Sequence, residues 1–162
     1  IGQELVGSAV ENWGGSLSLS NDGTIIVIGA SESDVGGTNK GRAVIYKYDS
    51  NTWTQMGSDI IGETIGDKCG ESGVVSGDGT TIGIGSRYAN TYAGHIRIYK
   101  YLNNSWMKMG DNIVGIANDY SALVALNKNG TVVASGAVLW NNDNSGLVRV
   151  YKMSSTFLIT DI

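Results

Sequence analysis

The sequence lacks proline altogether and has one cysteine and one histidine among its 162 residues. The single cysteine, Cys69, excludes an internal disulfide bond, and with the single histidine, His95, it makes no Cys–His spacing of a zinc site. No apolar run reaches the roughly 18 residues of a membrane-spanning helix. A formal net charge of −4 argues against a nucleic-acid surface and against anionic membranes. We therefore expect neither nucleic acid as a partner nor insertion into a membrane.

Glycine takes the place of proline in this chain. There are 24 glycines, with 41% apolar and only 16% charged residues. Turns that depend on glycine in left-handed conformations are typical of many short antiparallel strands. The apolar content is that of a packed domain. The composition therefore predicts an all-β fold, and no segment predicts a helix.

The chain repeats one unit three times. A turn of the type Asp-Gly or Asn-Gly ends at Gly23, Gly79 and Gly130, with spacings of 79 − 23 = 56 and 130 − 79 = 51 residues. Such turns join the strands of a β-hairpin, because both central residues accept positive φ. A strand-like run after each polar loop carries the tyrosines Tyr46, Tyr99 and Tyr151. A period of roughly 53 residues predicts a propeller, a solenoid or an array.

Each copy holds four strand-like runs. In the middle copy they are Ser72–Ser76, Thr80–Gly85, His95–Tyr101 and Trp106–Val114. We expect a single repeat domain over 1–162, whose copies span approximately 7–61, 62–114 and 115–162. Residues 1–6 complete a fourth-strand position, because Ile1–Gly7 matches Met56–Gly62. The chain opens without a methionine, which suggests a processed product or a piece of a longer protein.

Two folds fit three tandem repeats of four antiparallel strands. The first hypothesis is propeller-type blades, and the alternative is a β-trefoil; another three-fold arrangement of sheets also stays open. Three blades are too few for a closed propeller, which typically has about four to eight. The first hypothesis therefore includes further blades of a longer chain, or other copies of this chain, as partners.

Two linkers carry a family resemblance. Trp53–Gly57 reads Trp-x-Gln-x-Gly, and Gly62–Asp67 reads Gly-Glu-x-x-Gly-Asp. With the turn and strand pattern, they make the chain resemble FG-GAP-type β-propeller repeats, in particular the tandem repeats of secreted and surface proteins of marine bacteria, algae and their viruses. The third copy lacks the second linker and has Phe157 in place of the tryptophan. The resemblance implies four-stranded blades, an extracellular or cell- or virion-surface location, adhesion or scaffolding, and no enzyme activity.

The polar loop between the second and third runs is the variable part of the repeat. It spans Ala30–Lys40, Ser86–Ala93 and Ala137–Ser145, which occupy one place in the repeat and should share one rim. The side chains there that suit contacts with sugars or proteins are Tyr88, Asn90, Tyr92, Trp140, Asn142 and Asp143. The alternative is that the aromatic rings only cover the ends of the blades.

Patterns for catalysis and for metal binding are sparse. His95 stands at the start of a strand and is expected as a strand-edge polar residue, so we predict no catalytic residue and no cofactor. Glu32 and Asp34 offer a fragment of a calcium loop, and the alternative is that both are solvated turn residues. Asp22 and Asp78 are interpreted as turn formers, because an asparagine replaces them in the third copy.

Three further expectations follow from the repeat. The sequons at Asn103 and Asn129 lie in expected turns and can accept N-linked glycans, although an Asn-rich chain also contains sequons by chance. Cys69 falls opposite Trp13 and Tyr120, which predicts a buried apolar position rather than a reactive thiol. The two equivalent tryptophans, Trp53 and Trp106, should be at least half buried.

The function expected from these features is a non-enzymatic extracellular structural or adhesion module that associates with itself in a larger assembly or filament. Glycans or surface proteins are its expected ligands. The alternative is a lectin-like domain that binds carbohydrate through the aromatic residues of the loops.

Overall fold

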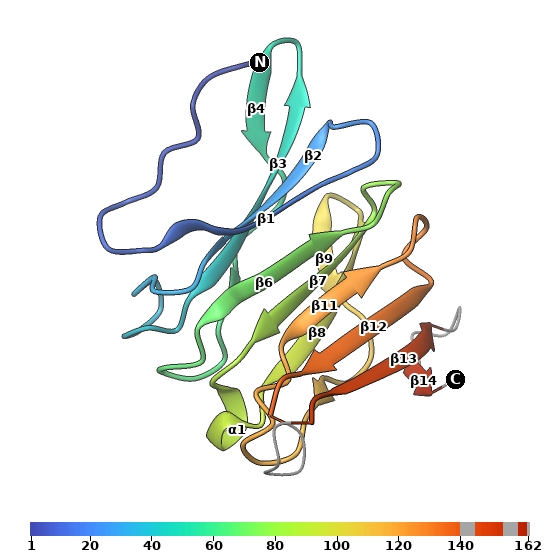
Figure 1. Ribbon diagram of the computed structural model, residues 1–162. Helices are drawn as coiled ribbons and strands as arrows, with labels where there is room; N and C mark the ends of the chain where they lie inside the picture. Colours follow the sequence, from blue (N-terminus) through green and yellow to red (C-terminus); the bar gives the residue numbers. More distant parts are fainter. Residues whose placement is uncertain (140–144, 154–158, 162) are drawn as a thin grey trace.

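The computed structural model describes residues 1–139, 145–153 and 159–161, and it contains three antiparallel β-sheets that follow one another along the chain (Figure 1). The first sheet contains β1 (Trp13–Leu19), β2 (Ile25–Ala30), β3 (Arg42–Asp49), β4 (Thr52–Gln55) and β5 (Ile60–Ile61). The second contains β6 (Cys69–Val75), β7 (Thr81–Ser86), β8 (His95–Leu102), β9 (Ser105–Lys108) and β10 (Ile113–Val114). The third contains β11 (Leu123–Leu126), β12 (Val132–Ala137), β13 (Leu147–Met153) and β14 (Ile159–Asp161).

Within each sheet, the four main strands lie side by side in the order in which the sequence presents them. The short strands β5 and β10 pair with the beginnings of β3 and β8. Because all four main strands of each repeat lie in one sheet, rather than being divided between a barrel and a hairpin cap, the β-trefoil alternative is wrong. The prediction of an all-β chain built from propeller-type blades is confirmed, and we call the sheets the first, second and third blades.

The first strands of the blades form their shared inner edge. β6 packs against β1 and β2, and β11 packs against β6 and β7. In Figure 1 the strands β1, β6 and β11 succeed one another across the molecule. The three blades therefore lie next to one another in space in the same order as in the sequence.

The turns between the first and second strands have the chemistry that the sequence predicts. One carboxylate oxygen of Asp22 accepts hydrogen bonds from the Ser20 hydroxyl at 2.6 Å and from the Thr24 amide at 3.0 Å. Asp78 makes the same pair of contacts in the second blade. In the third blade, the Asn129 side chain accepts a hydrogen bond from the following threonine hydroxyl at 2.7 Å. The interpretation of these residues as turn formers is confirmed.

Neighbouring blades approach each other closely at strand glycines. A Cβ atom added to Gly29 in β2 would lie well under 3.0 Å from the carbonyl oxygen of Gly70 in β6. The same atom on Gly85 in β7 would lie equally close to the carbonyl oxygen of Ala122, which immediately precedes β11. The Ser16 hydroxyl also donates to the Gly70 carbonyl, at 2.8 Å. We call this contact between an inner-strand carbonyl and a glycine of the preceding blade the glycine contact.

Two apolar clusters fill the spaces between the blades. The cluster between the first and second blades consists of Ile25, Val27, Ala43, Ile45, Ile60, Cys69, Val75, Ile82, Ile84, Tyr99 and Trp106. The cluster between the second and third blades consists of Ile96, Ile98, Met109, Ile113, Val133 and Met153. Since the two faces of the second blade contribute to different clusters, that blade is covered on both sides.

The two tryptophans occupy equivalent positions, as predicted. Trp106 is 7% exposed, and its indole N–H donates to the Met56 carbonyl of the first blade at 2.7 Å. Trp53 is more than half buried and donates to the Ile1 carbonyl at 3.3 Å. Each ring packs on the tyrosine across the adjacent turn, with centroids 4.9 Å and 5.1 Å apart. The expected burial of both rings is confirmed.

The expectation that the chain has no helical segment is wrong at one place. A single helical turn, α1 (Ala89–Tyr92), lies in the loop between β7 and β8. Its residues Asn90 and Thr91 have φ of 52° and 57°, so the turn is left-handed. The amide of Gly94 closes it on the Ala89 carbonyl at 3.0 Å. A left-handed turn of this kind has no apolar periodicity that the sequence could show.

The fourth run of the middle repeat is two strands rather than one. β9 pairs with the end of β8 and β10 with its beginning. Gly110, with φ of 61°, lies between them and interrupts the extended backbone. The run Trp106–Val114 is therefore split by Gly110 into the two strands β9 and β10.

The alignment of Cys69 with Tyr120 is wrong by one residue. A β-bulge lies near the start of β1 and of β6, but none is found in the described part of β11. The amides of Cys69 and Ser121 make the same contact with the preceding blade, at 2.9 Å in both cases. Ser121 is thus the counterpart of Cys69, and Tyr120 that of Lys68. Cys69 itself is fully buried, as predicted.

Candidate functional site

A buried carboxylate stands just before the inner strand of every blade. Glu11, Asp67 and Asp119 are 7%, 2% and 1% exposed. Each accepts a hydrogen bond from the backbone N–H three residues earlier, at 2.8–3.1 Å. The sequence analysis missed this set, although an acidic residue at the same place in all three copies was a visible signal. Each carboxylate therefore fixes the turn that leads into the inner strand of its blade.

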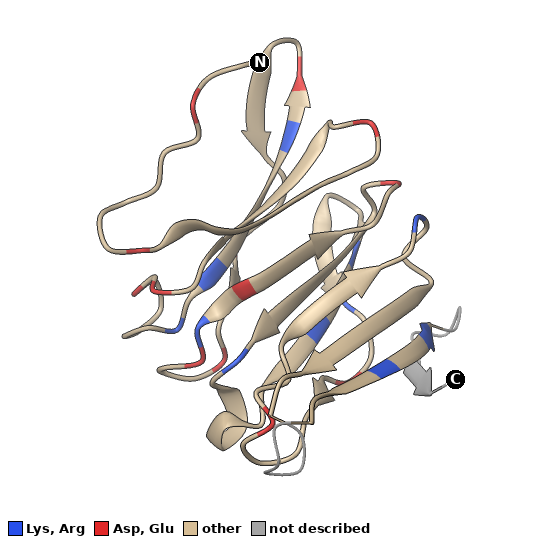
Figure 2. Cartoon of the chain, in the orientation of Figure 1, with Lys and Arg blue, Asp and Glu red and all other residues tan. Residues whose placement is uncertain are grey.

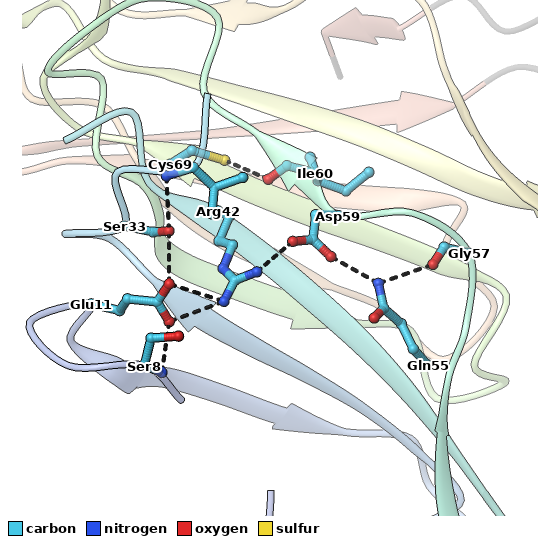
Figure 3. A network of polar contacts seen from close by, with 10 residues as sticks. Ser8, Glu11, Ser33, Arg42, Gln55, Gly57, Asp59, Ile60 and Cys69 are labelled. Carbon is cyan, nitrogen blue, oxygen red and sulfur yellow. Dashed lines mark hydrogen bonds and ion pairs between the residues drawn. The ribbon is translucent and has the colours of Figure 1, made fainter. Parts of the chain in front are cut away.

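In the first blade this carboxylate belongs to a network of hydrogen bonds and ion pairs (Figure 3). Arg42 donates to both oxygens of Glu11 at 3.0 Å and to Asp59 at 2.7 Å, and Gln55 donates to Asp59 at 2.8 Å. Burial acts to raise the pKa of Glu11, but the hydrogen bonds and charge of Arg42 outweigh it, and the pKa is lowered. Both carboxylates are paired with Arg42, so the network fixes the fold around β3, although the Arg42 Nε atom is buried and has no partner among the described residues.

In the second blade the corresponding positions form a buried polar row. Cys69, Ser86 and His95 are register partners across β6, β7 and β8, and each is at most 1% exposed. Arg97 donates to the Cys69 sulfur at 3.1 Å and to the Ile61 carbonyl at 2.8 Å. Burial raises the pKa of the Cys69 thiol, which therefore stays protonated and unreactive.

The expectation of His95 as a strand-edge polar residue is wrong. Its side chain is 1% exposed, because it pairs in register with Ser86 inside the space between two blades. Burial, followed by the charge of Arg97, lowers the pKa of His95. The imidazole is therefore neutral near pH 7.

Charged and aromatic side chains meet at the loop end of the blades. Figure 2 marks where the charged residues lie along the chain. The Lys68 ammonium lies 2.7 Å from Glu32 and 5.1 Å from the ring centroid of Tyr88. The Arg87 guanidinium lies 3.2 Å from Glu71 and 5.2 Å from the ring centroid of Tyr120. Three tyrosines connect the two pairs, with ring centroids 5.7–5.8 Å apart, namely Tyr88, Tyr92 and Tyr120.

The predicted loop residues are only partly brought together. Tyr88 and Tyr92 contact each other, and the Asn90 amide nitrogen lies 3.5 Å from Nδ1 of His95. Tyr120, which the sequence analysis did not place in the loop group, completes the aromatic cluster from the start of the third blade. The remaining predicted residues, Trp140, Asn142 and Asp143, lie outside the described residues.

A pocket of about 100 Å³ opens beside this cluster, between the inner ends of the second and third blades. Its lining residues are Glu71, Ser72, Arg87, Tyr120, Ala122, Leu123 and Val138. One carboxylate oxygen of Glu71 faces Arg87, whereas the other, Oε2, is buried and has no hydrogen-bond partner among the described residues. The Nε atom of Arg87 is likewise buried and unpartnered within that part of the chain. These two atoms are not specific to the pocket, because the Nε atoms of Arg42 and Arg97 are also buried and unpartnered among the described residues.

The residues predicted for calcium lie around a different pocket. Glu32 and Asp34 line it together with Glu11. Glu32 is paired with Lys68, and Asp34 accepts a hydrogen bond from the Asn39 amide at 2.8 Å. Among the described residues, no group of three or more His, Cys, Asp or Glu side chains is placed to hold a metal ion. Calcium binding there stays a prediction.

The two sequons lie in exposed turns. Asn103 has φ of 49° in the β8–β9 turn and is exposed. Asn129 is exposed too, but its side-chain oxygen accepts hydrogen bonds from Thr131 and Asn127. Glycosylation at either site stays a prediction. In the part of the chain that the structure describes, no helix is long and apolar enough to cross a membrane.

Comparison with known proteins identifies similar folds. No family model matches the chain, and no curated protein matches it in sequence. A structure assigned as a 6-phosphogluconolactonase from Bacteroides uniformis matches 90% of this chain and 38% of its own, with a TM-score of 0.59 and 18% identity. A periplasmic gluconolactonase from Pseudomonas aeruginosa matches 85% and 39%, with a TM-score of 0.55 and 15% identity. TolB from Acinetobacter baumannii matches 94% and 32%, with a TM-score of 0.52 and 15% identity.

These likenesses establish the propeller-type fold, and the chain spans about two fifths of the length of the two lactonases. They also correct the functional expectation. A non-enzymatic, self-associating adhesion module, with a lectin as the alternative, is contradicted, because two of the similar structures are named as lactonases, which are enzymes. The sequence argument rested on the resemblance to FG-GAP-type repeats and on the scarcity of catalytic patterns, and neither could reveal the likeness to structures of enzymes.

Proposed function

We propose that this chain contributes a substrate-binding pocket to a β-propeller enzyme that hydrolyses a small sugar-derived lactone. The observation that carries the proposal is the Glu71–Arg87 pair in the pocket between the second and third blades, with one buried acceptor and one buried donor unused. Buried polar groups are normally partnered, so a ligand with its own donor and acceptor fits this place. The named activities of two similar structures supply the reaction class.

The pair can divide the work of ester hydrolysis. Glu71 Oε2 takes a proton from a water molecule as the water oxygen forms a bond to the lactone carbonyl carbon. Arg87 Nε donates a hydrogen bond to the carbonyl oxygen, which gains negative charge in that step. The ring C–O bond then breaks, and Glu71 returns the proton to the ring oxygen. The product is the open-chain hydroxy acid, and the step needs no cofactor.

The remaining lining suits the body of a sugar-derived ring. The Tyr120 ring gives an apolar face beside the polar pair, and Ala122 and Leu123 add apolar surface. Ligand pockets commonly have about 300–1,000 Å³. A pocket of about 100 Å³ therefore encloses one end of such a molecule, and further blades would enclose the rest.

Three finer points belong to the same proposal. The linkers Trp53–Gly57 and Gly62–Asp67 support FG-GAP-type repeats, and the second is folded on itself, because Asp67 accepts a hydrogen bond from the Thr64 amide at 2.8 Å. Export from the cytoplasm is supported by the periplasmic gluconolactonase among the similar structures. Further propeller blades are the partners that the coverage of those structures favours.

The experiment is a hydrolysis assay with gluconolactone and its 6-phosphate, following acid release with a pH indicator. We expect release above the buffer rate, and a loss of roughly 10²-fold in Glu71→Gln, since general-base catalysis contributes at least that much. Asp49→Asn is the matched control, because Asp49 is an exposed carboxylate in the outer half of the first blade. It should leave the rate unchanged.

A binding measurement tests whether the pocket binds the ligand, independently of whether this chain alone can hydrolyse it. Gluconate and its 6-phosphate, titrated into the chain, should shift the NMR signals of Arg87 and Tyr120, and Arg87→Met should remove the shifts. Hydrolysis at the buffer rate together with unshifted Arg87 and Tyr120 signals would contradict the proposal. An equal rate in Glu71→Gln would overturn the role assigned to Glu71.

A further inference from the structure

Three tyrosine rings are in mutual contact at the loop end of the second and third blades. The centroids of Tyr88, Tyr92 and Tyr120 lie 5.7–5.8 Å apart, within the range of direct aromatic contact. The other ring–ring contacts between described residues each join a tyrosine to a tryptophan, as Tyr48 does to Trp53. Contact of one phenol ring with another therefore distinguishes this cluster within the part of the chain that the structure describes.

Tyr92 and Tyr120 are the most nearly parallel pair of the cluster, and they come from different blades. Their ring planes are inclined at 34°, whereas Tyr88 meets the two rings at 78° and 84°. Tyr92 ends the turn α1 of the second blade, and Tyr120 lies just before β11 of the third. The Tyr120 amide donates to the Tyr92 carbonyl at 3.0 Å. The backbone thus holds these two phenol rings in contact across the boundary between the blades.

Both residues have a backbone conformation that is unfavourable for a bulky side chain. The angle φ is 62° at Tyr92 and 53° at Tyr120, which lies in the left-handed region, where a bulky residue is an outlier. The counterpart of Tyr120 in the first blade is Asn12, with φ of 54°, and asparagine tolerates this conformation better. Strained backbone of this kind clusters at functional sites. A role for the two rings themselves would account for tyrosine at both positions.

One ring of the pair is accessible to an oxidant in solution. Tyr92 is 45% exposed, and Tyr120 is partly buried beneath the cluster. The single thiol that would compete for oxidation, that of Cys69, is fully buried. Because Tyr92 and Tyr120 are already in contact, coupling between them needs no encounter of two chains.

We propose that Tyr92 and Tyr120 are a site of oxidative cross-linking, at which a peroxide-dependent oxidant of the haem peroxidase type joins the two phenol rings. The oxidant removes one hydrogen atom from each hydroxyl group. The two radicals form a carbon–carbon bond between ring positions next to the oxygens, and the hydrogen on each of these carbons moves to the phenol oxygen. Hydrogen peroxide takes up the two removed hydrogen atoms and becomes two molecules of water. The product, dityrosine, ties the second blade to the third.

The test treats the complete chain with a haem peroxidase and one hydrogen peroxide per chain, at a dilution that limits coupling between chains. We expect the blue fluorescence of dityrosine in the monomer fraction and a mass lowered by two hydrogen atoms. The tryptic peptides 88–97 and 109–128 should be linked, and their fragmentation should place the link at Tyr92 and Tyr120. The linked chain should unfold at a higher urea concentration, because a cross-link constrains the unfolded state.

Tyr92→Phe and Tyr120→Phe keep the rings but remove the hydroxyl group that is oxidised. Each should lower the fluorescence of the monomer fraction at least about tenfold, because coupling then requires rings that are not held in contact. Tyr48→Phe is the matched control and should leave the fluorescence unchanged, since Tyr48 packs on Trp53 rather than on a tyrosine. Tyr88→Phe should also leave the link in place.

Equal fluorescence in Tyr92→Phe would overturn the proposal, as would dityrosine that forms only between chains. Loss of the link in Tyr88→Phe together with an unchanged yield in Tyr92→Phe would assign the site to another pair and overturn it too. The reaction contains no lactone, so its outcome is independent of the function proposed for the pocket.

Discussion

The boundary between the first and second blades and the boundary between the second and third share a backbone contact but differ in side chains. Both have the glycine contact, at Gly29 and at Gly85. The first boundary also buries Trp106 and the guanidinium of Arg97. The second is filled by a smaller apolar cluster, to which the third blade contributes Val133 and Met153. The comparison indicates that backbone approach sets how blades stack, while the side chains that fill the gap can vary.

The largest expected difference between the boundaries lies in their apolar side chains. Trp106→Ala should lower the free energy of unfolding by about 3–5 kcal/mol, and Met153→Ala by about 2–3 kcal/mol. Both side chains are similarly buried, at 7% and 8% exposed, so the difference reflects size and the hydrogen bond of the indole to Met56. Urea unfolding of the two variants measures it. A cost for Met153→Ala equal to that of Trp106→Ala would show that the two boundaries are equally strong.

A second difference is sensitivity to pH. His95 lies in the first boundary, and its counterpart in the third blade is Leu147. Because burial and Arg97 lower the pKa of His95 from 6.5, the unfolded chain binds a proton that the folded chain does not. The free energy of unfolding should therefore be highest above about pH 6.5, fall as the pH drops from there toward the lowered pKa of the folded state, and level off below it, with a slope of at most about 1.4 kcal/mol per pH unit.

His95→Leu, which copies the third blade, should flatten this slope between about pH 7.5 and 5.5. The charged groups that act on His95 besides Arg97 are Glu63, Asp67 and Lys108. His95 is the single histidine of the chain, so no other side chain of this type can supply the slope. A slope that persists unchanged in His95→Leu would show that groups other than His95 cause it and would contradict this prediction.

The sequence was sufficient for the strands and turns. The tyrosines Tyr46, Tyr99 and Tyr151 do lie in β3, β8 and β13, and the Asp-Gly turns do join the first two strands of the blades. These features are local, because alternation and turn chemistry act over a few residues. The glycines Gly29 and Gly85 were visible in the same pattern, but their purpose depends on a strand of the next blade, which no local pattern describes.

Less of the candidate site could be predicted from the sequence. Glu71, Arg87 and Tyr120 come from three different segments and meet only because two blades pack together. A missing bulge before β11 also shifted the alignment at Tyr120 by one residue, which hid its relation to Lys68. The expected loop residues Tyr88 and Tyr92 do lie at the same end of the molecule, next to this group.

The most direct test of the account is the effect of adding one methyl group to each strand glycine. We expect Gly136→Ala to raise the free energy of unfolding by at most about 0.5–1 kcal/mol, since alanine replaces glycine in a strand. The added methyl group meets the Leu123 Cβ atom at 3.2 Å, so Leu123 must move by a few tenths of an ångström. Gly29→Ala and Gly85→Ala should each lower the free energy of unfolding by about 1–3 kcal/mol, because the added methyl group meets a backbone carbonyl. Urea unfolding of the three variants measures all three values. A loss in Gly136→Ala equal to that in Gly85→Ala, or no loss in any of the three, would contradict the stacking of blades through glycine contacts.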